Sequence, residues 1–254
     1  MKFGFSKWSI VPVRAEAKEQ SEMVTQLLFG DTFTVLAEKP KWIQIQNFQD
    51  NYTGWIDRLL FFEITETEFN FLNQADIIFT TEVVSQILVN NIQLYLVSGS
   101  IIHKTYPLGF TLDIDYKFTK TNINASRESI VALANQYLGS PYLWGGKTPF
   151  GIDCSGFSQT IYKMIGHSIP RDASEQVTLG KSRNFIDEAL PGDLAFFDND
   201  EGRVIHVGIV LENKKIIHAS GHVRIDTLDH QGIYNTELKI YTHKLRVIQN
   251  LFID

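Results

Sequence analysis

The chain is organised around Gly-Gly-Lys-Thr-Pro-Phe-Gly-Ile-Asp-Cys-Ser-Gly-Phe at residues 145–157, which contains its only cysteine, Cys154. Apolar residues recur at helical spacing after it, and Gly166 follows where a helix end favours glycine. Asp153 is a good N-cap residue, so Cys154 is predicted in the first turn of a helix. Unpaired N–H groups and the helix dipole favour a thiolate there. The alternative interpretation is an unreactive buried cysteine.

Two histidines, His206 and His218, lie in consecutive runs rich in β-branched residues, at 204–210 and 215–220. Polar residues 212–214 separate the two runs. This pattern is typical of a β-hairpin, so we predict one here.

The length of the hairpin loop decides whether the two histidines meet. With a three-residue loop, Leu211 faces Lys215, and both histidines point to one face with Gly208 leaving room between them. A two-residue loop would send them to opposite faces. We predict the longer loop, which supplies a base, His206, and an orienting group, His218, to the cysteine.

A zinc site is the competing interpretation, because one cysteine and two histidines are a known catalytic zinc set. The cysteine at the helix start has no second thiol or carboxylate at ligand spacing. We therefore predict no metal and no cofactor.

Several motifs resemble the NlpC/P60 cysteine peptidases, which act on bacterial cell-wall peptides. They are Asp-Cys-Ser-Gly-Phe at 153–157, His-Val-Gly-Ile at 206–209 and Ile-His-Ala at 217–219, with further agreement at 134–146, 169–172 and 190–194. The resemblance covers roughly residues 125–250. It implies a papain-like α+β domain, in which the helix that carries the nucleophile packs on an antiparallel sheet.

The resemblance also assigns catalytic roles. Cys154 would attack the scissile carbonyl, His206 would transfer the proton, and His218 would fix the tautomer of His206. Tyr142 would lie near the oxyanion; packing through its ring is the alternative.

Substrate-binding roles follow from the same family. Asp153 and Ser155 would hydrogen-bond the γ-D-glutamyl part of the substrate, and Trp144 would form a wall. Arg171 is expected to pair with a carboxylate for structural reasons.

A recycling branch of the family reads a free N-terminal amine with an acidic residue and a tyrosine of its front domain, plus an aspartate after a Pro-Arg motif. Asp172 matches this aspartate. Glu22 and Tyr52 are the best matches for the other two residues, and a solvated surface role is the alternative for Glu22. Carboxylates and hydroxyls in a partly dry pocket suit an ammonium group.

The front half reads as short strands separated by turns. Residues 1–60, which end in Gly-Trp-Ile at 54–56, resemble a bacterial SH3-like barrel. Residues 61–121 are also rich in strand-like runs. They are predicted to form a second, divergent SH3-like barrel, and an extension of the first barrel is the alternative. Residues 122–254 would form the peptidase domain.

Composition excludes several classes of partner. The net charge of −6 without a basic cluster argues against nucleic acid and anionic membranes. A lone cysteine allows no internal disulfide, and the first residues show no apolar core of signal-peptide length, so we expect a cytoplasmic protein.

The expected activity is cleavage between γ-D-Glu and a diamino acid in free murein peptides that begin with L-Ala. The competing classes are a secreted peptidoglycan hydrolase, a non-catalytic wall-binding module and an acyltransferase or amide hydrolase. The identity of the diamino acid, the length of the stem peptide and the oligomeric state stay open.

Overall fold

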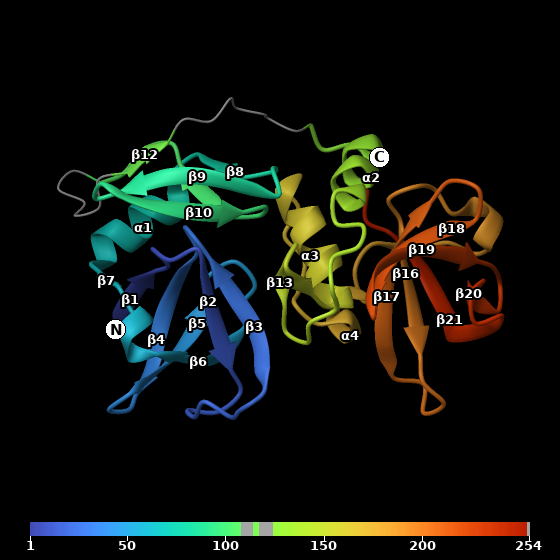
Figure 1. Ribbon diagram of the computed structural model, residues 1–254, viewed down its shortest axis with the longest axis horizontal. Helices are drawn as coiled ribbons and strands as arrows, with labels where there is room; N and C mark the ends of the chain where they lie inside the picture. The colour runs from blue at the N-terminus through green and yellow to red at the C-terminus, as the bar shows by residue number, and fades with distance from the viewer. Residues whose placement is uncertain (108–113, 117–123, 253–254) are drawn as a thin grey trace. The chain divides into compact units, whose positions relative to one another are not determined.

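The computed structural model describes residues 1–107, 114–116 and 124–252. The chain divides into two compact units, Met1–Asn122 and Ile123–Asp254 (Figure 1). The boundary predicted between residues 121 and 122 lies outside the described residues. The division of the first unit at residue 60 stays a prediction.

The first unit is built on a seven-stranded antiparallel sheet with the order β3-β2-β6-β5-β4-β1-β7. Alternation along β5 places one set of side chains inside, as Ile43 and Ile45 show. The strands are β1 (Lys2–Phe5), β2 (Ile10–Arg14), β3 (Met23–Leu28), β4 (Thr32–Glu38), β5 (Trp42–Asn47), β6 (Thr53–Asp57) and β7 (Glu63–Ile64), and a short helix η1 (Arg58–Leu60) follows β6.

The second half of this unit contains a helix that the sequence analysis missed. Helix α1 (Glu66–Gln74) begins with a capping box in which the Thr65 hydroxyl accepts the N–H of Glu68. Phe69 and Leu72 of α1 are buried in a core shared with β1 and the later strands. The later strands are β8 (Ile77–Phe79), β9 (Val84–Val89), β10 (Ile92–Val97), β11 (Ile101–His103) and β12 (Ile114–Tyr116).

The second unit begins with helices. Ser126 caps α2 (Arg127–Asn135) as predicted, because its hydroxyl accepts the N–H of Ser129 at 3.1 Å. The other elements before the barrel are β13 (Lys147–Thr148), β14 (Gly151–Ile152), α3 (Cys154–Met164) and α4 (Ala173–Gln176). Gly166 adopts a φ of +86° directly after α3, which is the left-handed conformation expected at a helix end.

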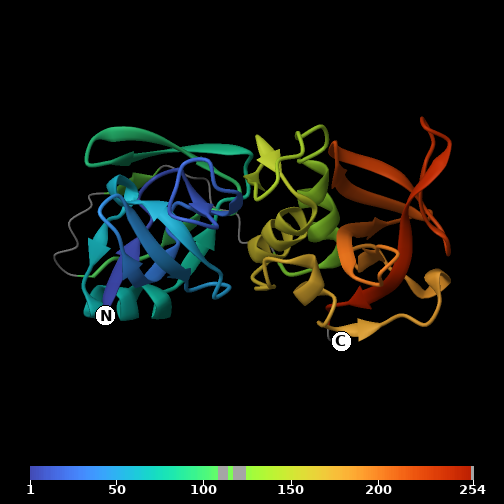
Figure 2. The ribbon, with the colours of Figure 1, turned by 90° about the horizontal axis from the view of Figure 1, so that it is seen from below.

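The predicted antiparallel sheet closes on itself. Its order is β15-β21-β16-β17-β18-β19-β20, and β20 also pairs with β21, so six strands form a closed barrel. Helices α2 and α3 contact β17 on one side of this barrel (Figure 2). The elements are β15 (Lys181–Ser182), η2 (Ile186–Glu188), β16 (Leu194–Asp198), β17 (Val204–Leu211), β18 (Lys215–Ser220), β19 (His222–Leu228), β20 (Gly232–Asn235) and β21 (Ile240–Asn250).

A buried carboxylate joins the helices to the barrel. Asp193 accepts hydrogen bonds from Arg127 of α2 and from Arg183, each at 2.8 Å. These charge-assisted bonds fix the turn that leads into β16. None of the helices in the described ranges has the length and apolarity needed to cross a bilayer.

Candidate active site

The start of α3 has the cap that the sequence predicts. The Asp153 side chain accepts the N–H of Gly156 at 2.6 Å and the N–H of Gly145 at 2.8 Å. Cys154 is the first residue of the helix. The carboxylate therefore fixes both the helix start and the glycine loop that precedes it.

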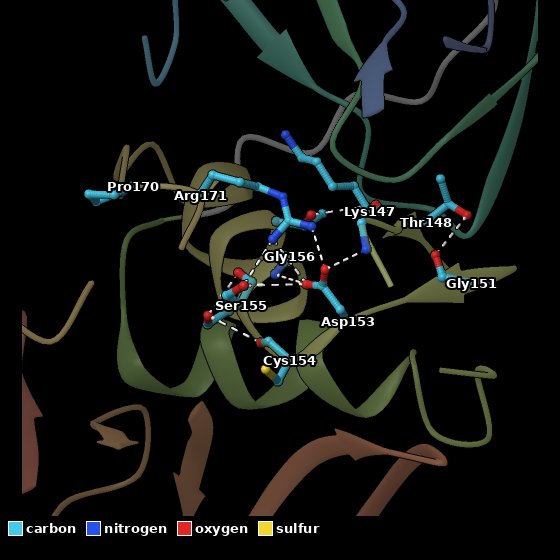
Figure 3. A network of polar contacts seen from close by, with 12 residues as sticks. Lys147, Thr148, Gly151, Asp153, Cys154, Ser155, Gly156, Pro170 and Arg171 are labelled. Carbon is cyan, nitrogen blue, oxygen red and sulfur yellow. Dashed lines mark hydrogen bonds and ion pairs between the residues drawn. The ribbon is translucent and has the colours of Figure 1, made fainter. Parts of the chain in front are cut away.

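A buried arginine holds this cap in place (Figure 3). Arg171 is 1 % exposed, and its two terminal nitrogens bond the two oxygens of Asp153. It also donates to the Ser155 hydroxyl at 2.9 Å. The predicted structural ion pair of Arg171 is confirmed, and both oxygens of Asp153 are engaged within the protein.

The thiol of Cys154 lies beside β17, the first strand of the predicted histidine hairpin. The N–H of Val207 in β17 hydrogen-bonds the sulfur, and Cys154 is 8 % exposed. Burial, and then the charge of Asp153, raise the pKa of Cys154 to about 12. This corrects the expected thiolate, because desolvation disfavours the charged form more than the helix start stabilises it. The resting group is a thiol.

The predicted hairpin register is confirmed. Leu211 pairs with Lys215 and Ile209 with Ile217, as the three-residue loop requires. Nε2 of His206 lies 2.8 Å from Nδ1 of His218, so the histidines do share a face.

A carboxylate that the sequence analysis missed continues this chain of contacts. Nε2 of His218 lies 3.1 Å from Oδ2 of Asp226, which also forms an ion pair with Arg224. Burial by itself raises the pKa of Asp226, but hydrogen bonds from His218 and Arg224 outweigh it, so the pKa lies below its ordinary value. Asp226 therefore accepts hydrogen bonds from both residues. The alternation of polar residues along β19 was the feature of the sequence that pointed to it.

An ionised Asp226 assigns the tautomers of both histidines. His218 must donate from Nε2 to the carboxylate, so its Nδ1 accepts the hydrogen bond from Nε2–H of His206. The lone pair of His206 is then on Nδ1, which is the nitrogen left to take a proton from the thiol.

A third histidine, also missed, completes the cluster. His243 of β21 stacks on His206 with ring centroids 4.1 Å apart. Phe197 contacts both rings, at 5.7 and 5.9 Å between centroids. Burial lowers the pKa of His243 to about 4. The sequence around it gave no signal, because β21 is brought near the hairpin by long-range pairing with β16.

The remaining predicted residues of this unit lie before α3, within it or in the loop that follows it. Tyr142 is half-buried, and burial together with the nearby Cys154 raises its pKa to about 12, so its hydroxyl stays a donor. Ser155 is buried, Asp172 is partly buried at the start of α4, and Trp144 is 61 % exposed. Their roles toward substrate stay predictions.

The two predicted residues of the first unit lie at strand starts. Glu22 is exposed directly before β3, and Tyr52 is partly buried directly before β6. Their predicted role in amine recognition stays a prediction.

The site defines a class of protein. A buried thiol at a helix start, next to an imidazole whose tautomer is fixed by a second histidine and a carboxylate, is the arrangement of a cysteine hydrolase that works by acyl transfer.

Comparison with known proteins finds a matching family within each unit. Residues 139–242 match the NlpC/P60 family, and residues 13–58 match the family described as bacterial dipeptidyl-peptidase Sh3 domain. The chain thus has a region similar to NlpC/P60 domains, preceded by a region similar to a bacterial SH3 domain.

Curated relatives carry related names. A gamma-D-glutamyl-L-lysine dipeptidyl-peptidase of Bacillus subtilis is 42 % identical over 116 residues, which are 44 % of this chain and 38 % of that protein. One of Bacillus cereus is 25 % identical over 233 residues, 78 % of this chain and 68 % of that protein. The match thus spans little more than a third of the first relative.

A solved structure agrees in fold. An NlpC/P60 family protein from Bacillus cereus has a TM-score of 0.80 at 18 % identity, covering 98 % of this chain and 99 % of that chain. The similarity extends over both units.

Proposed function

We propose that this protein hydrolyses the bond between γ-D-Glu and a diamino acid in free murein peptides, releasing L-Ala-γ-D-Glu. The observation that carries the proposal is the hydrogen-bonded series from Asp226 through His218 to His206, whose neighbour Val207 donates its N–H to the sulfur of Cys154. A peptidase needs a nucleophile and a base that returns its proton to the leaving amine, and this series supplies both.

The tautomers define the proton's path. Sulfur attacks the γ-carbonyl carbon of D-Glu while the thiol proton passes to Nδ1 of His206. The C–N bond then breaks, and His206 returns the proton to the leaving amine of the diamino acid. A water molecule, deprotonated by His206, hydrolyses the thioester and restores the thiol. Tyr142 is the proposed donor to the oxyanion, because its hydroxyl stays protonated at neutral pH.

The substrate class is proposed from the relatives. Their names describe a dipeptidyl-peptidase that acts on a γ-D-glutamyl-L-lysine bond. Removing a dipeptide from an N-terminus requires a free amine, and Asp172, Glu22 and Tyr52 are the proposed residues that recognise it. Restriction to free peptides suits recycling in the cytoplasm rather than digestion of intact wall.

The proposal is tested by mass spectrometry of products from L-Ala-γ-D-Glu-L-Lys and from the meso-diaminopimelate peptide. Each is run beside the same peptide with an acetylated L-Ala amine, and Cys154→Ala is the control. We expect cleavage of the free peptides only, which Cys154→Ala abolishes.

Two results would contradict the proposal. Equal cleavage of free and acetylated peptides would indicate a wall hydrolase without amine recognition. No cleavage by folded protein would favour a binding module or another acyl transfer.

Unchanged kcat/KM in both Glu22→Ala and Tyr52→Phe would exclude these two residues from amine recognition.

A further inference from the structure

The peptidase mechanism uses two of the three clustered histidines and leaves His243 without a role. One ring nitrogen from each of His206, His218 and His243 lies within 4.8 Å of the others. Each histidine comes from a different strand of the closed barrel, β17, β18 or β21, so the barrel holds the three rings together.

Each ring has a nitrogen placed for an ion. Nδ1 of His243 lies 2.9 Å from the Thr242 hydroxyl, which leaves Nε2 for a ligand bond. Nε2 of His206 and Nδ1 of His218 face each other at 2.8 Å. Tetrahedral Zn²⁺ with bonds of about 2.0–2.1 Å separates its nitrogens by about 3.3 Å, so these two rings need to part by only about half an ångström.

A pocket that carries two carboxylates reaches the cluster at His243. The pocket has a volume of about 400 Å³, and its lining includes Asp198, Asp200, His243 and one cation, Lys244. Asp198 is 8 % exposed, and its Oδ1 has no hydrogen-bond partner among the described residues. Its Oδ2 lies 3.9 Å from Nε of Arg246. Carboxylates at the entrance of a pocket raise the local concentration of cations.

We propose that a Zn²⁺ ion binds His206, His218 and His243 from this pocket and switches the peptidase off. Coordination at Nε2 of His206 moves its proton to Nδ1, the nitrogen that the proposed mechanism uses as the base. The imidazole stays neutral but loses the lone pair that must accept the thiol proton. The ion also replaces the His206–His218 hydrogen bond. Three imidazoles are a common ligand set for zinc, with water in the fourth position.

Inhibition rests on the proposed peptidase function, but binding does not, so binding is measured separately. Cys154→Ala protein is titrated with Co²⁺, which reports coordination by its visible absorption. We expect one ion per chain. His243→Phe in the same background keeps a ring stacked on His206 without the nitrogen donor, and we expect its affinity to fall about tenfold or more. His230→Phe, an exposed histidine of the same unit, is the matched control.

Inhibition by Zn²⁺ is then measured on enzyme with intact Cys154, relative to the metal-free activity of each variant. Zinc should inhibit the wild type and His230→Phe alike, and His243→Phe at least about tenfold more weakly. Two results would overturn the proposal: no Co²⁺ binding to Cys154→Ala protein, or equal inhibition of His243→Phe, since either would place the ion elsewhere. Circular dichroism confirms folding, and His243→Asn replaces His243→Phe if the latter does not fold.

Discussion

Gly208 provides the space that His218 occupies. A Cβ built on Gly208 would lie 2.9 Å from Cβ of His218 and 2.7 Å from a methyl carbon of Ile216. Real Cβ atoms do not approach so closely, so any side chain here must push β18 away from β17. The distance between the two catalytic histidines thus depends on a residue that has no side chain.

We expect Gly208→Ala to lower kcat/KM by about tenfold or more, because small displacements of catalytic groups are costly. Overpacking should also destabilise the fold by about 1–3 kcal/mol. Steady-state kinetics and urea unfolding measure the two effects. Ile205→Ala, which removes an exposed side chain from the same strand, should change neither by much. Wild-type activity in Gly208→Ala would show that the strands adjust without moving the histidines.

Asp226→Asn tests the assignment of the tautomers. An amide presents an N–H₂ donor where the carboxylate accepts, so His218 is free to turn its proton to Nδ1 and break the hydrogen bond from His206. We expect kcat to fall about 10²-fold or more, with a smaller change in KM. Asp229→Asn, in the neighbouring turn, is the matched control. If the two variants behave alike, Asp226 does not orient the histidines.

The pH profile should show an unusually acidic base. Burial, followed by the neighbouring His243 and His218, lowers the pKa of His206 well below 6.5. A base acts in its unprotonated form, so a lowered pKa moves the acid limb of kcat/KM to lower pH. We expect activity at pH 6 close to that at pH 7, measured with two peptides that differ in their own ionisation. An acid limb at or above pH 6.5 in both would contradict the expectation.

The sequence was sufficient where local chemistry decides the structure. Asp153 and Gly166 mark the ends of α3 because caps act within one turn. The hairpin register followed from loop length and strand alternation, which are also local. Helix α1 was missed although Thr65 and Glu68 form a capping box, because strand-like runs around it dominated the interpretation.

Long-range closure explains the residues that could not be predicted. Asp226 reaches His218 from the neighbouring strand β19, and the polar alternation of β19 indicates the face on which Asp226 lies but not its partner. His243 reaches His206 because β21 pairs with both β16 and β20 and closes the barrel. No local pattern encodes that pairing. The pKa of Cys154 also depends on burial by the whole unit, which outweighs the helix start.

The last prediction concerns Arg171, whose planar guanidinium joins Asp153 to Ser155. Removing a buried partner leaves an unpaired charge, so Arg171→Met should cost about 3–5 kcal/mol of unfolding free energy. Arg171→Lys keeps the charge but not the fork, since one ammonium does not reach both carboxylate oxygens and the hydroxyl together. We expect Arg171→Lys to fold and to lose about tenfold or more in kcat/KM, because Asp153 sets the start of α3 and the position of Cys154.

The matched control is Arg203→Lys, an exposed arginine paired with Glu201, which should leave both stability and kinetics unchanged. Chemical unfolding and steady-state kinetics on the same samples separate the two effects. Full activity in Arg171→Lys would mean that charge alone holds the cap. In that case, the position of Cys154 would depend on the backbone hydrogen bonds that Asp153 accepts from Gly145 and Gly156, which lysine leaves intact.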